Sequence, residues 1–390
     1  MRAKLLFILG TRPEAIKLAP LILKSKKTDF FDVKVCSTGQ HKQMLEQVTS
    51  FFNLKIDYDL SLMKQNQSLF DITADMLKAL EPVIEKEEPD NIIVQGDTTT
   101  ALVGTLAGFY KKISVVHIEA GLRTYNKYSP FPEEMNRILI SRIADYHFAP
   151  SEKSRDNLSA EGIKDGVHIV GNTAIDALSL GLDLIERNGD KTYKEFFNFL
   201  DFSKKIILVT GHRRESFGNG FENICGALKE LSELRNDIQI VYPVHLNPNV
   251  SEPVNRMLGN LPGIFLIKPL EYQYLIWLMN KSFLVLTDSG GIQEEAPFLC
   301  KPVIVMRDST ERIEAVEAGV SVLVGTHKDR IVAETLDLLE NKSRYEIMSR
   351  PVNLYGDGKS SEKIISILKQ SNYSLGANQR FQSEFLGLNC

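Results

Sequence analysis

The sequence is poor in cysteine. Its four cysteines, Cys36, Cys225, Cys300 and Cys390, are scattered over 390 residues. Cysteines so far apart suggest neither a metal-binding knuckle nor the disulfide framework of a small secreted domain. This usage favours the cytoplasm. No other group of residues has metal-ligand spacing, so neither a metal nor another cofactor is expected.

The chain also lacks a long apolar run and an excess of one charge. Its first apolar stretch, Lys4–Leu9, is too short for a secretory signal peptide and is predicted to be a β-strand. No run is long enough to span a bilayer, so no membrane partner is expected. With 46 basic and 50 acidic residues, the net charge of −4 gives no general reason to expect nucleic acid. Any anionic ligand must therefore be met by local basic groups.

What the chain does contain is a regular alternation of short apolar runs and amphipathic segments. Nearly continuous apolar strands separated by helices predict a parallel sheet covered on both faces. A chain of 390 residues is long for one core, and the alternation restarts after Asn188. We therefore predict an α/β protein with two doubly wound, Rossmann-like domains, residues 1–171 and 172–367, facing a cleft. Ligands of such folds bind beyond the carboxyl ends of the strands.

One stretch combines a predicted strand end, two glycines and a helix start. Leu284–Leu286 is followed by Ser289, Gly290 and Gly291 and then by a helix-forming segment. This arrangement predicts a phosphate site, because free N–H groups and the positive end of the helix dipole meet there. Glu295, on the first turns of that helix, could accept hydrogen bonds from ribose hydroxyls. Taken alone, the motif slightly favours an ordinary strand–turn–helix connection.

Other polar residues follow predicted strands of the first domain. Arg12 and Lys17, at the start of a helix, either face an anion or are solvated bases on a capped helix. Asp97 is compatible with an N-cap or with a base projecting into the cleft. His117 is interpreted as a core histidine, whereas Glu119 ends a buried strand and needs a partner or a chemical role. Glu133 and Arg137, spaced i,i+4 at a helix start, are explained by helix stability alone.

The second domain has a basic loop after the predicted strand Lys205–Val209. His212 and Arg213 there suit a diphosphate, because the arginine binds charge and the histidine can hold or donate a proton. Arg312, after another strand, adds positive charge to the same edge. A merely basic surface loop is the alternative interpretation.

Taken together, the ordered motifs resemble those of the non-hydrolysing UDP-N-acetylglucosamine 2-epimerases over almost the whole chain. The motifs are Gly10-Thr11-Arg12-Pro13-Glu14, Gly39-Gln40-His41, Gln95-Gly96-Asp97-Thr98, His117-Ile118-Glu119-Ala120-Gly121-Leu122-Arg123, Phe131-Pro132-Glu133-Glu134, Asn136-Arg137, Gly211-His212-Arg213-Arg214-Glu215, Asp288-Ser289-Gly290-Gly291, Gln293-Glu294-Glu295 and Leu354-Tyr355-Gly356-Asp357-Gly358. The resemblance implies the two-domain glycosyltransferase-B type architecture. It also implies that the C-terminal segment, residues 368–390, joins the first domain.

The resemblance further implies a reaction. Members of the family interconvert UDP-N-acetylglucosamine and UDP-N-acetylmannosamine by eliminating UDP to give a 2-acetamidoglucal and adding UDP back with the opposite configuration at C2. Asp97, Glu119 and Glu133 match the acid/base carboxylates of the family, and His212 matches a group that assists departure and return of UDP. Which carboxylate takes the C2 proton is left open by the sequence.

The remaining matched positions are expected to bind the substrate. Arg12, Lys17 and Arg137 match the sugar-phosphate end, and Ser289, Gly290 and Gly291 match the phosphate site. The other matches are His212, Arg213 and Arg312 for the diphosphate, Glu295 for the ribose, and Leu270 and Leu275 for the uracil, with Leu275 standing where some members have an aromatic residue.

Several bacterial members bind a second UDP-N-acetylglucosamine as an allosteric activator. The matching positions here are Gln40, Gln43, Glu133, Arg213 and His245. An arginine of that site in some members is Asn66 here, so weaker phosphate contact is expected. The resemblance also suggests a homodimer and a product that feeds cell-envelope polysaccharides.

Three other functions are compatible with parts of this pattern. A hydrolysing 2-epimerase would release free N-acetylmannosamine, but that branch departs from the Arg12-Pro13-Glu14 pattern kept here. A glycosyltransferase of the same architecture would need an acceptor site rather than three carboxylates around C2. A catalytically silent nucleotide-sugar sensor is disfavoured because every candidate catalytic position is filled.

Overall fold

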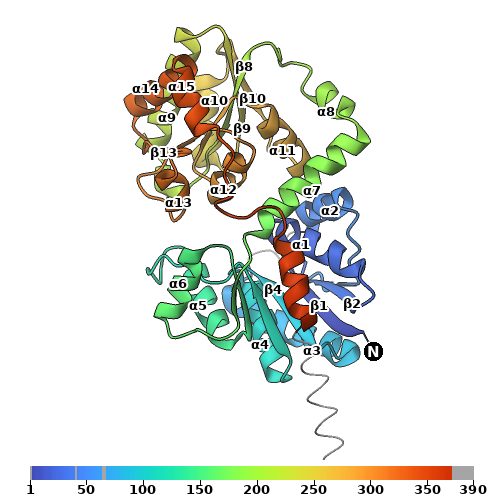
Figure 1. The fold of residues 1–390 in the computed structure, drawn as a ribbon. Coiled ribbons are helices and arrows are strands. Elements are labelled where there is room, and N and C mark those ends of the chain that lie inside the picture. The colour runs from blue at the N-terminus through green and yellow to red at the C-terminus, as the bar shows by residue number, and fades with distance from the viewer. Residues whose placement is uncertain (1, 40–41, 64–66, 371–390) are drawn as a thin grey trace, which may run out of the picture. The chain divides into compact units, whose positions relative to one another are not determined.

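The computed structural model describes residues 2–39, 42–63 and 67–370, with the side chains of residues 42–44 outside the description. The chain divides into two compact units. The first contains the residues up to Ala177 and those from Tyr355 onward, and the second is Leu178–Leu354 (Figure 1).

In the first unit, the described residues form a seven-stranded sheet in which every pair of neighbours is parallel. The strand order is β3-β2-β1-β4-β5-β6-β7. The strands are β1 Ala3–Leu9, β2 Phe31–Ser37, β3 Tyr58–Asp59, β4 Asn91–Gln95, β5 Ser114–Ile118, β6 Tyr146–Ala149 and β7 Val167–Ile169. The helices are α1 Arg12–Lys26, α2 Lys42–Phe51, α3 Leu69–Glu87, α4 Thr99–Tyr110, α5 Glu133–Ile143, α6 Glu152–Ala160 and α7 Thr173–Asn188, the last of which runs into the second unit.

The core of this unit follows from the apolar strands. All five residues of β4 are buried, as are the last five of β1. The helices α3, α4 and α5 pack side by side and bury Met76, Leu80 and Ile140 with Ile92 and Val94 of the sheet. A strand buried on both faces needs apolar residues at successive positions, which is why these strands are recognisable in the sequence.

In the second unit, the described residues form a six-stranded parallel sheet of order β10-β9-β8-β11-β12-β13. This is the order of dinucleotide-binding folds. The strands are β8 Lys205–Thr210, β9 Ile238–Pro243, β10 Ile264–Ile267, β11 Leu284–Thr287, β12 Val303–Val305 and β13 Ser321–Leu323. The helices are α8 Lys191–Phe196, the 3-10 helix η1 Arg214–Ser216, α9 Asn219–Leu234, α10 Pro248–Leu258, α11 Tyr272–Lys281, α12 Gly290–Phe298, α13 Ile313–Glu317, α14 Lys328–Glu340 and α15 Lys342–Met348.

The prediction of two doubly wound α/β domains is confirmed by these sheets. Each has a switch point, between β1 and β4 in the first unit and between β8 and β11 in the second, where the strand order reverses direction. Loops that leave adjacent strands there diverge to opposite faces of the sheet and open a crevice, which is where such folds bind ligands.

The domain boundaries in the structure differ from the predicted ones. The prediction ended the first domain at residue 171 and placed 355–367 in the second domain, whereas the structure assigns the segment from Tyr355 to the first unit. The reason is a set of non-local contacts. Asn172 N donates to Tyr355 O at 2.6 Å, and Asp176 accepts hydrogen bonds from Ser360 N and Ser361 N at 3.1 and 2.7 Å.

The helical residues 360–370 continue this association with the first unit. Ile364 and Leu368 are buried, and Glu362 pairs with Lys24 of α1 at 2.7 Å. Figure 1 shows this helix in red beside α1. The close approach of the two segments also requires glycine at position 171, because a Cβ there would lie 2.9 Å from Gly356 Cα and φ is +92°.

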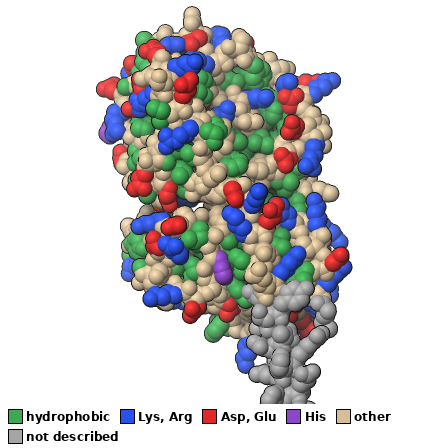
Figure 2. Space-filling model, viewed as in Figure 1, with side chains coloured by type: hydrophobic (Ala, Val, Ile, Leu, Met, Phe, Trp, Pro, Cys, Tyr) green, Lys and Arg blue, Asp and Glu red, His purple; other side chains and the backbone are tan. Residues whose placement is uncertain are grey.

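The described residues can be examined for a membrane-spanning helix and for the distribution of surface charge. Among the described residues, no helix has both the length and the apolar character needed to cross a bilayer. Basic and acidic side chains are interspersed over the face of the molecule seen in Figure 2. Binding of an anion would therefore depend on the local arrangement of side chains.

Candidate active site

The loops at the switch point of the first unit are joined by a buried carboxylate, Glu14. Its Oε2 accepts hydrogen bonds from Gly10 N at 3.0 Å and Thr11 N at 2.7 Å, and its Oε1 accepts one from Thr98 Oγ1 at 2.6 Å. Thr98 in turn caps α4 by accepting from Ala101 N at 3.0 Å. Glu14 thus ties the loop after β1 to the loop after β4. Arg12, half-buried, is the first residue of α1.

Glu119 follows β5 and lies on the same edge of the sheet. Lys17, on α1, donates from Nζ to both carboxylate oxygens of Glu119 at 2.6 and 2.7 Å. Gln95 Nε2 also donates to Glu119, and Asn172 Nδ2 donates at 2.9 Å. Glu119 is 7% exposed and has φ +63°, a conformation that non-glycine residues rarely adopt. Strain of this kind persists where surrounding contacts over-determine it, often at functional sites.

Asp97 follows β4, beside Glu119. Its carboxylate is paired with Arg137 of α5, and its main-chain oxygen accepts from Asn136 Nδ2 at 2.9 Å. Burial raises the pKa of the Asp97 carboxyl above its usual range, and the charge of Glu119 adds to this, while Arg137 and Lys17 oppose it. A carboxyl with a raised pKa can exchange protons nearer neutral pH than an ordinary aspartate.

His117 supports the backbone of this loop. Gly96, at φ +70°, turns the chain between β4 and Asp97, and His117 Nε2 lies 2.7 Å from Gly96 O. His117 is 1% exposed, and burial lowers its pKa to about 3, so the ring is neutral and donates to that oxygen. The interpretation of His117 as a core histidine agrees with this burial.

Arg137 has partners other than the expected one. The i,i+4 spacing suggested a pair with Glu133, but Arg137 Nη1 lies 3.3 Å from Glu134 Oε2 and Nη2 pairs with Asp97. Glu134 is fully buried and also accepts from Thr124 N and Tyr125 N at 3.0 and 2.8 Å. Glu133 is half-buried and forms no hydrogen bond or ion pair within the described part of the chain. It is therefore available to a ligand.

The switch point of the second unit carries the predicted basic loop. After β8, His212 N and Arg213 N donate to Asp288 Oδ2 at 2.7 and 2.8 Å, and Arg213 Nε donates to Asp288 O at 3.3 Å. The His212 ring is stacked on that of His245, with centroids 5.5 Å apart. Burial lowers the pKa of His212, and the charge of Asp288 opposes this shift. One buried carboxylate thus holds the main chain of both His212 and Arg213.

The loop after β11 leads into the N-terminus of α12, as the motif predicted. Ser289 is the N-cap, and its amide donates to Thr287 Oγ1 at 2.9 Å. Gly290 begins the helix directly against Arg312: a Cβ at position 290 would lie 2.9 Å from Arg312 Cζ. Gly291 is exposed, with open space where its Cβ would be. The helix therefore presents its amide end together with a guanidinium.

Arg312 is oriented by carboxylates. Its Nε donates to Glu294 Oε1 at 2.9 Å and its Nη1 to Glu311 Oε1 at 2.6 Å. Burial would raise the pKa of Glu311, but Arg312 and Arg307 outweigh it and hold that pKa at about 2. Glu311 is therefore ionised at neutral pH and keeps the guanidinium in place.

The other predicted residues of the second unit lie on separate elements. Glu295 is buried on α12, Leu270 is buried just before α11, and Leu275 is half-buried on α11. Of the residues matched to the activator site, Gln40 lies outside the described residues, as does Asn66. Gln43 lies in α2 with its side chain outside the description.

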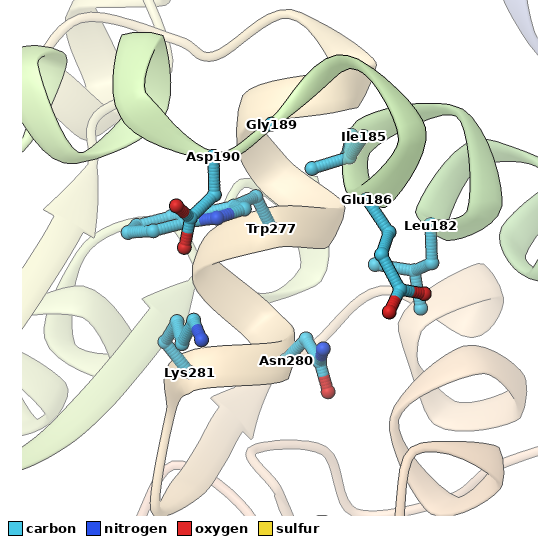
Figure 3. A pocket seen from close by; sticks show the side chains of 8 residues that line it. All are labelled: Leu182, Ile185, Glu186, Gly189, Asp190, Trp277, Asn280 and Lys281. Atoms are coloured by element: carbon cyan, nitrogen blue, oxygen red, sulfur yellow. The ribbon is translucent and has the colours of Figure 1, made fainter.

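A pocket of about 490 Å³ lies elsewhere in the second unit, between α7 and α11 (Figure 3). It is lined by Leu182, Ile185, Glu186, Gly189, Asp190, Trp277, Asn280 and Lys281. None of the predicted site residues is among them. The ammonium of Lys281 already lies 5.7 Å from the centre of the Trp277 ring, so the aromatic surface has a cation partner within the chain.

Several residues that shape the two switch points were not predicted as site residues. Gln95 and Asn172 hold Glu119, Glu14 and Asn136 hold the loop that carries Asp97, and Asp288 holds His212 and Arg213. Polar residues next to buried strand ends were a usable signal for Gln95 and Asp288. Asn172 carried no such signal, because its partner is 53 residues away in the sequence.

The chain is similar to known proteins over nearly its whole length. The family model described as UDP-N-acetylglucosamine 2-epimerase matches residues 23–369. The UDP-N-acetylglucosamine 2-epimerase of Escherichia coli (strain K12) is 54% identical over 376 residues, which cover 95% of this chain and 100% of that protein.

Solved structures agree with this match. The UDP-GlcNAc 2-epimerase of Neisseria meningitidis, bound to UDP-GlcNAc, is 48% identical with a TM-score of 0.89 and covers 94% of this chain and 100% of that one. A complex of MnaA from S. aureus with UDP is 43% identical with a TM-score of 0.85 and covers 95% of this chain and 97% of that one.

Proposed function

Because the chain belongs to the UDP-N-acetylglucosamine 2-epimerase family, we propose that it interconverts UDP-N-acetylglucosamine and UDP-N-acetylmannosamine at C2 without net hydrolysis. The hydrogen at C2 is barely acidic, so simple removal and return of that proton is unfavourable. In the proposed reaction a base takes the C2 proton, the C1–O bond to UDP breaks and a C1=C2 double bond forms. UDP is then added back to the 2-acetamidoglucal, and a proton returns to the opposite face of C2.

The proximity of the Asp97 and Glu119 carboxylates is the observation that carries this proposal. The two carboxylates lie at one switch point, close enough for the charge of Glu119 to raise the pKa of Asp97. Each also has its own cation, Arg137 for Asp97 and Lys17 for Glu119. Two neighbouring carboxylates in different environments suit a reaction that must both remove and deliver a proton. We assign proton transfer to Asp97 and Glu119, with Glu133 holding the sugar.

The second unit has the groups that a departing diphosphate needs. Ser289, Gly290 and Gly291 offer the amide end of α12, and Arg312 lies against it. Anions are favoured at such a helix end by unpaired N–H groups and by the helix dipole. His212 and Arg213 would stabilise the charge that develops on UDP, and Glu295 would accept from the ribose hydroxyls.

The non-hydrolysing assignment concerns retention of the intermediate. It is supported by the loop Arg12-Pro13-Glu14, in which Glu14 fastens the start of α1 to Thr98 beside Asp97. A rigid loop beside the carboxylates would help to keep water from the glycal, since enclosure prevents side reactions of reactive intermediates.

The deciding experiment is incubation with UDP-N-acetylglucosamine in D2O, followed by proton NMR of the sugar. We expect UDP-N-acetylmannosamine to appear, with deuterium at C2 in both epimers. Free N-acetylmannosamine as the main product would instead assign the protein to the hydrolysing class. Binding of the substrate without any exchange at C2 would refute epimerisation and favour a transferase or a sensor.

Allosteric activation by a second substrate molecule is also part of the proposal. A second UDP-N-acetylglucosamine would activate the enzyme through Arg213 and His245, together with Gln40, Gln43 and Glu133. The stacking of His245 on His212 gives such a ligand a direct connection to the diphosphate side. Sigmoidal dependence of the rate on substrate would support activation, and simple saturation would contradict it.

The protein is also proposed to act as a cytoplasmic homodimer. Phe109 and Tyr110, exposed aromatic side chains at the end of α4 whose ring centroids lie 6.2 Å apart, support a partner surface on the first unit. Light scattering should give twice the chain mass, and a monomer at assay concentrations would contradict the homodimer.

A further inference from the structure

Asp288 holds His212 by two kinds of contact. It follows β11 and is 0% exposed. Its Oδ2 accepts from the main-chain amides of His212 and Arg213 at 2.7 and 2.8 Å, which fixes the loop that carries the imidazole. Its Oδ1 lies 3.5 Å from His212 Nδ1. Among the described residues, that Oδ1 is buried and has no hydrogen-bond partner.

A buried carboxylate oxygen is costly to leave without a donor. The polar atom that faces Oδ1 is Nδ1 of His212, and a ring nitrogen donates only when it carries a hydrogen. The 3.5 Å separation is long for a hydrogen bond, and catalytic hydrogen bonds often reach their full strength only in the complex with substrate. The ring of His245 is stacked on the imidazole, with the centroids 5.5 Å apart.

We infer that Asp288 is a positioning residue that keeps the proton of neutral His212 on Nδ1, so that Nε2 is directed away from the carboxylate and towards UDP. This inference rests on the proposed role of His212 at the diphosphate. With Nδ1 protonated, Nε2 can take up a proton from solvent, and the resulting imidazolium can donate that proton to the UDP oxygen as the C1–O bond breaks. When UDP returns, Nε2 takes the proton back from the attacking UDP oxygen.

The charged and titratable groups around the imidazole make Asp288 distinctive. Burial, His245 and Arg213 all lower the pKa of His212, whereas Asp288 raises it. Asp288 therefore opposes every other influence on the basicity of this ring. Without its charge the imidazolium form would be harder to reach.

Asp288→Asn separates the anchoring role from the electrostatic one. The amide oxygen can replace Oδ2 and accept from both main-chain amides, so the loop keeps its anchor. The amide NH2 then faces His212 Nδ1 and, being a donor, favours the tautomer with the hydrogen on Nε2. A wrong tautomer of a catalytic histidine costs activity even when the geometry of the site is intact.

The test is NMR of the full-length protein labelled with 15N in histidine, recorded over a pH series. Signals of His212 are assigned by their absence in His212→Gln. In the wild type we expect the neutral ring to carry its hydrogen on Nδ1. In Asp288→Asn we expect the hydrogen on Nε2, a lower pKa for the ring, and kcat reduced by about 100-fold or more, the range typical of lost acid–base catalysis. The affinity for UDP, measured by calorimetry, should change far less than kcat.

Asp145→Asn is the matched control. Asp145 also anchors a main-chain amide, accepting from Val115 N at 2.8 Å, but at the amino end of β5 in the first unit. The substitution Asp145→Asn should leave the tautomer of His212, the pKa of His212 and kcat at their wild-type values.

An Nε2–H tautomer in the wild type would overturn the inference, whether or not the variant folds. Equal tautomers and equal pH profiles in the wild type and Asp288→Asn would overturn it as well. Failure of the proposed function would look different: wild-type protein would bind UDP without exchanging deuterium at C2, and the tautomer would still decide the role of Asp288.

Discussion

Thr98→Val should weaken the switch point of the first unit more than the loss of a helix cap alone. The substitution keeps the shape of the side chain but removes the hydroxyl that caps α4 and donates to Glu14 at 2.6 Å. Loss of an N-cap costs about 1 kcal/mol. A buried carboxylate oxygen left without its donor costs about 1–3 kcal/mol more, and Glu14 is 1% exposed. We therefore expect a total loss of about 2–4 kcal/mol.

The assay is amide hydrogen exchange of peptides from β4 and α4, because it reports the free energy of opening of this region separately. Fluorescence of Trp277, the single tryptophan of the chain, reports on the second unit and should not change. Thr98→Ser retains the hydroxyl and should restore most of the stability. Ser68→Ala removes an exposed cap of α3, whose Oγ accepts from Asp71 N at 3.1 Å, and serves as the control for cap loss.

The effect should also depend on pH. Burial raises the pKa of Glu14 above its usual range, and the hydrogen bond from Thr98 is one of the contacts that lower it. Removing that bond raises the folded-state pKa further, so the destabilisation is full above that pKa and shrinks as the pH falls through it. If Thr98→Val and Ser68→Ala cost the same at every pH, the contact between Thr98 and Glu14 contributes nothing and the reasoning is refuted.

Other predictions concern the two switch points. Gly290→Ala should displace Arg312 and lower the stability of the second unit by about 1–3 kcal/mol. Gly291→Ala places its Cβ in open space, so it should be neutral or stabilise the unit by up to about 1 kcal/mol. Unfolding in urea, followed by the fluorescence of Trp277, measures the stability of both variants. Asp97→Asn should reduce kcat by about 100-fold or more with UDP affinity retained, and near-normal turnover would exclude Asp97 from proton transfer. Arg137→Met removes a charge that lowers the pKa of Asp97, so the 13C carboxyl signal of Asp97 should titrate at higher pH than in the wild type.

Local patterns in the sequence account for much of the agreement between the predicted and the observed strands and helices. The apolar runs of β1, β4, β8 and β11 are visible in the sequence because a strand buried on both faces has no polar side to interrupt it. The short β3 has two residues and was not predicted, since so brief a run carries no periodic signal. The glycines of α12 act over a few residues, which is why a motif reveals them. The N-cap of α4 is Thr98 rather than Asp97, the cap candidate in the sequence.

Assignments that depend on contacts between distant residues were less accessible. The segment from Tyr355 joins the first unit through hydrogen bonds between residues about 180 positions apart in the chain. Asp176 accepts from Ser360 N, and Asn172 N donates to Tyr355 O. Nothing in the local composition of that segment distinguishes it from the second unit.

The sequence by itself determined the two parallel sheets, the strand ends at which polar residues collect, and the candidate carboxylates and bases. The tertiary structure alone decided which of these groups neutralise one another. Arg137 pairs with Asp97 and Glu134 rather than Glu133, Lys17 reaches Glu119 across 102 positions, and Asp288 reaches His212 across 76. The physical reason is range: propensity and periodicity act over one or two turns, whereas the partner of a buried charge is set by whichever distant loop the folded sheet brings within hydrogen-bonding distance.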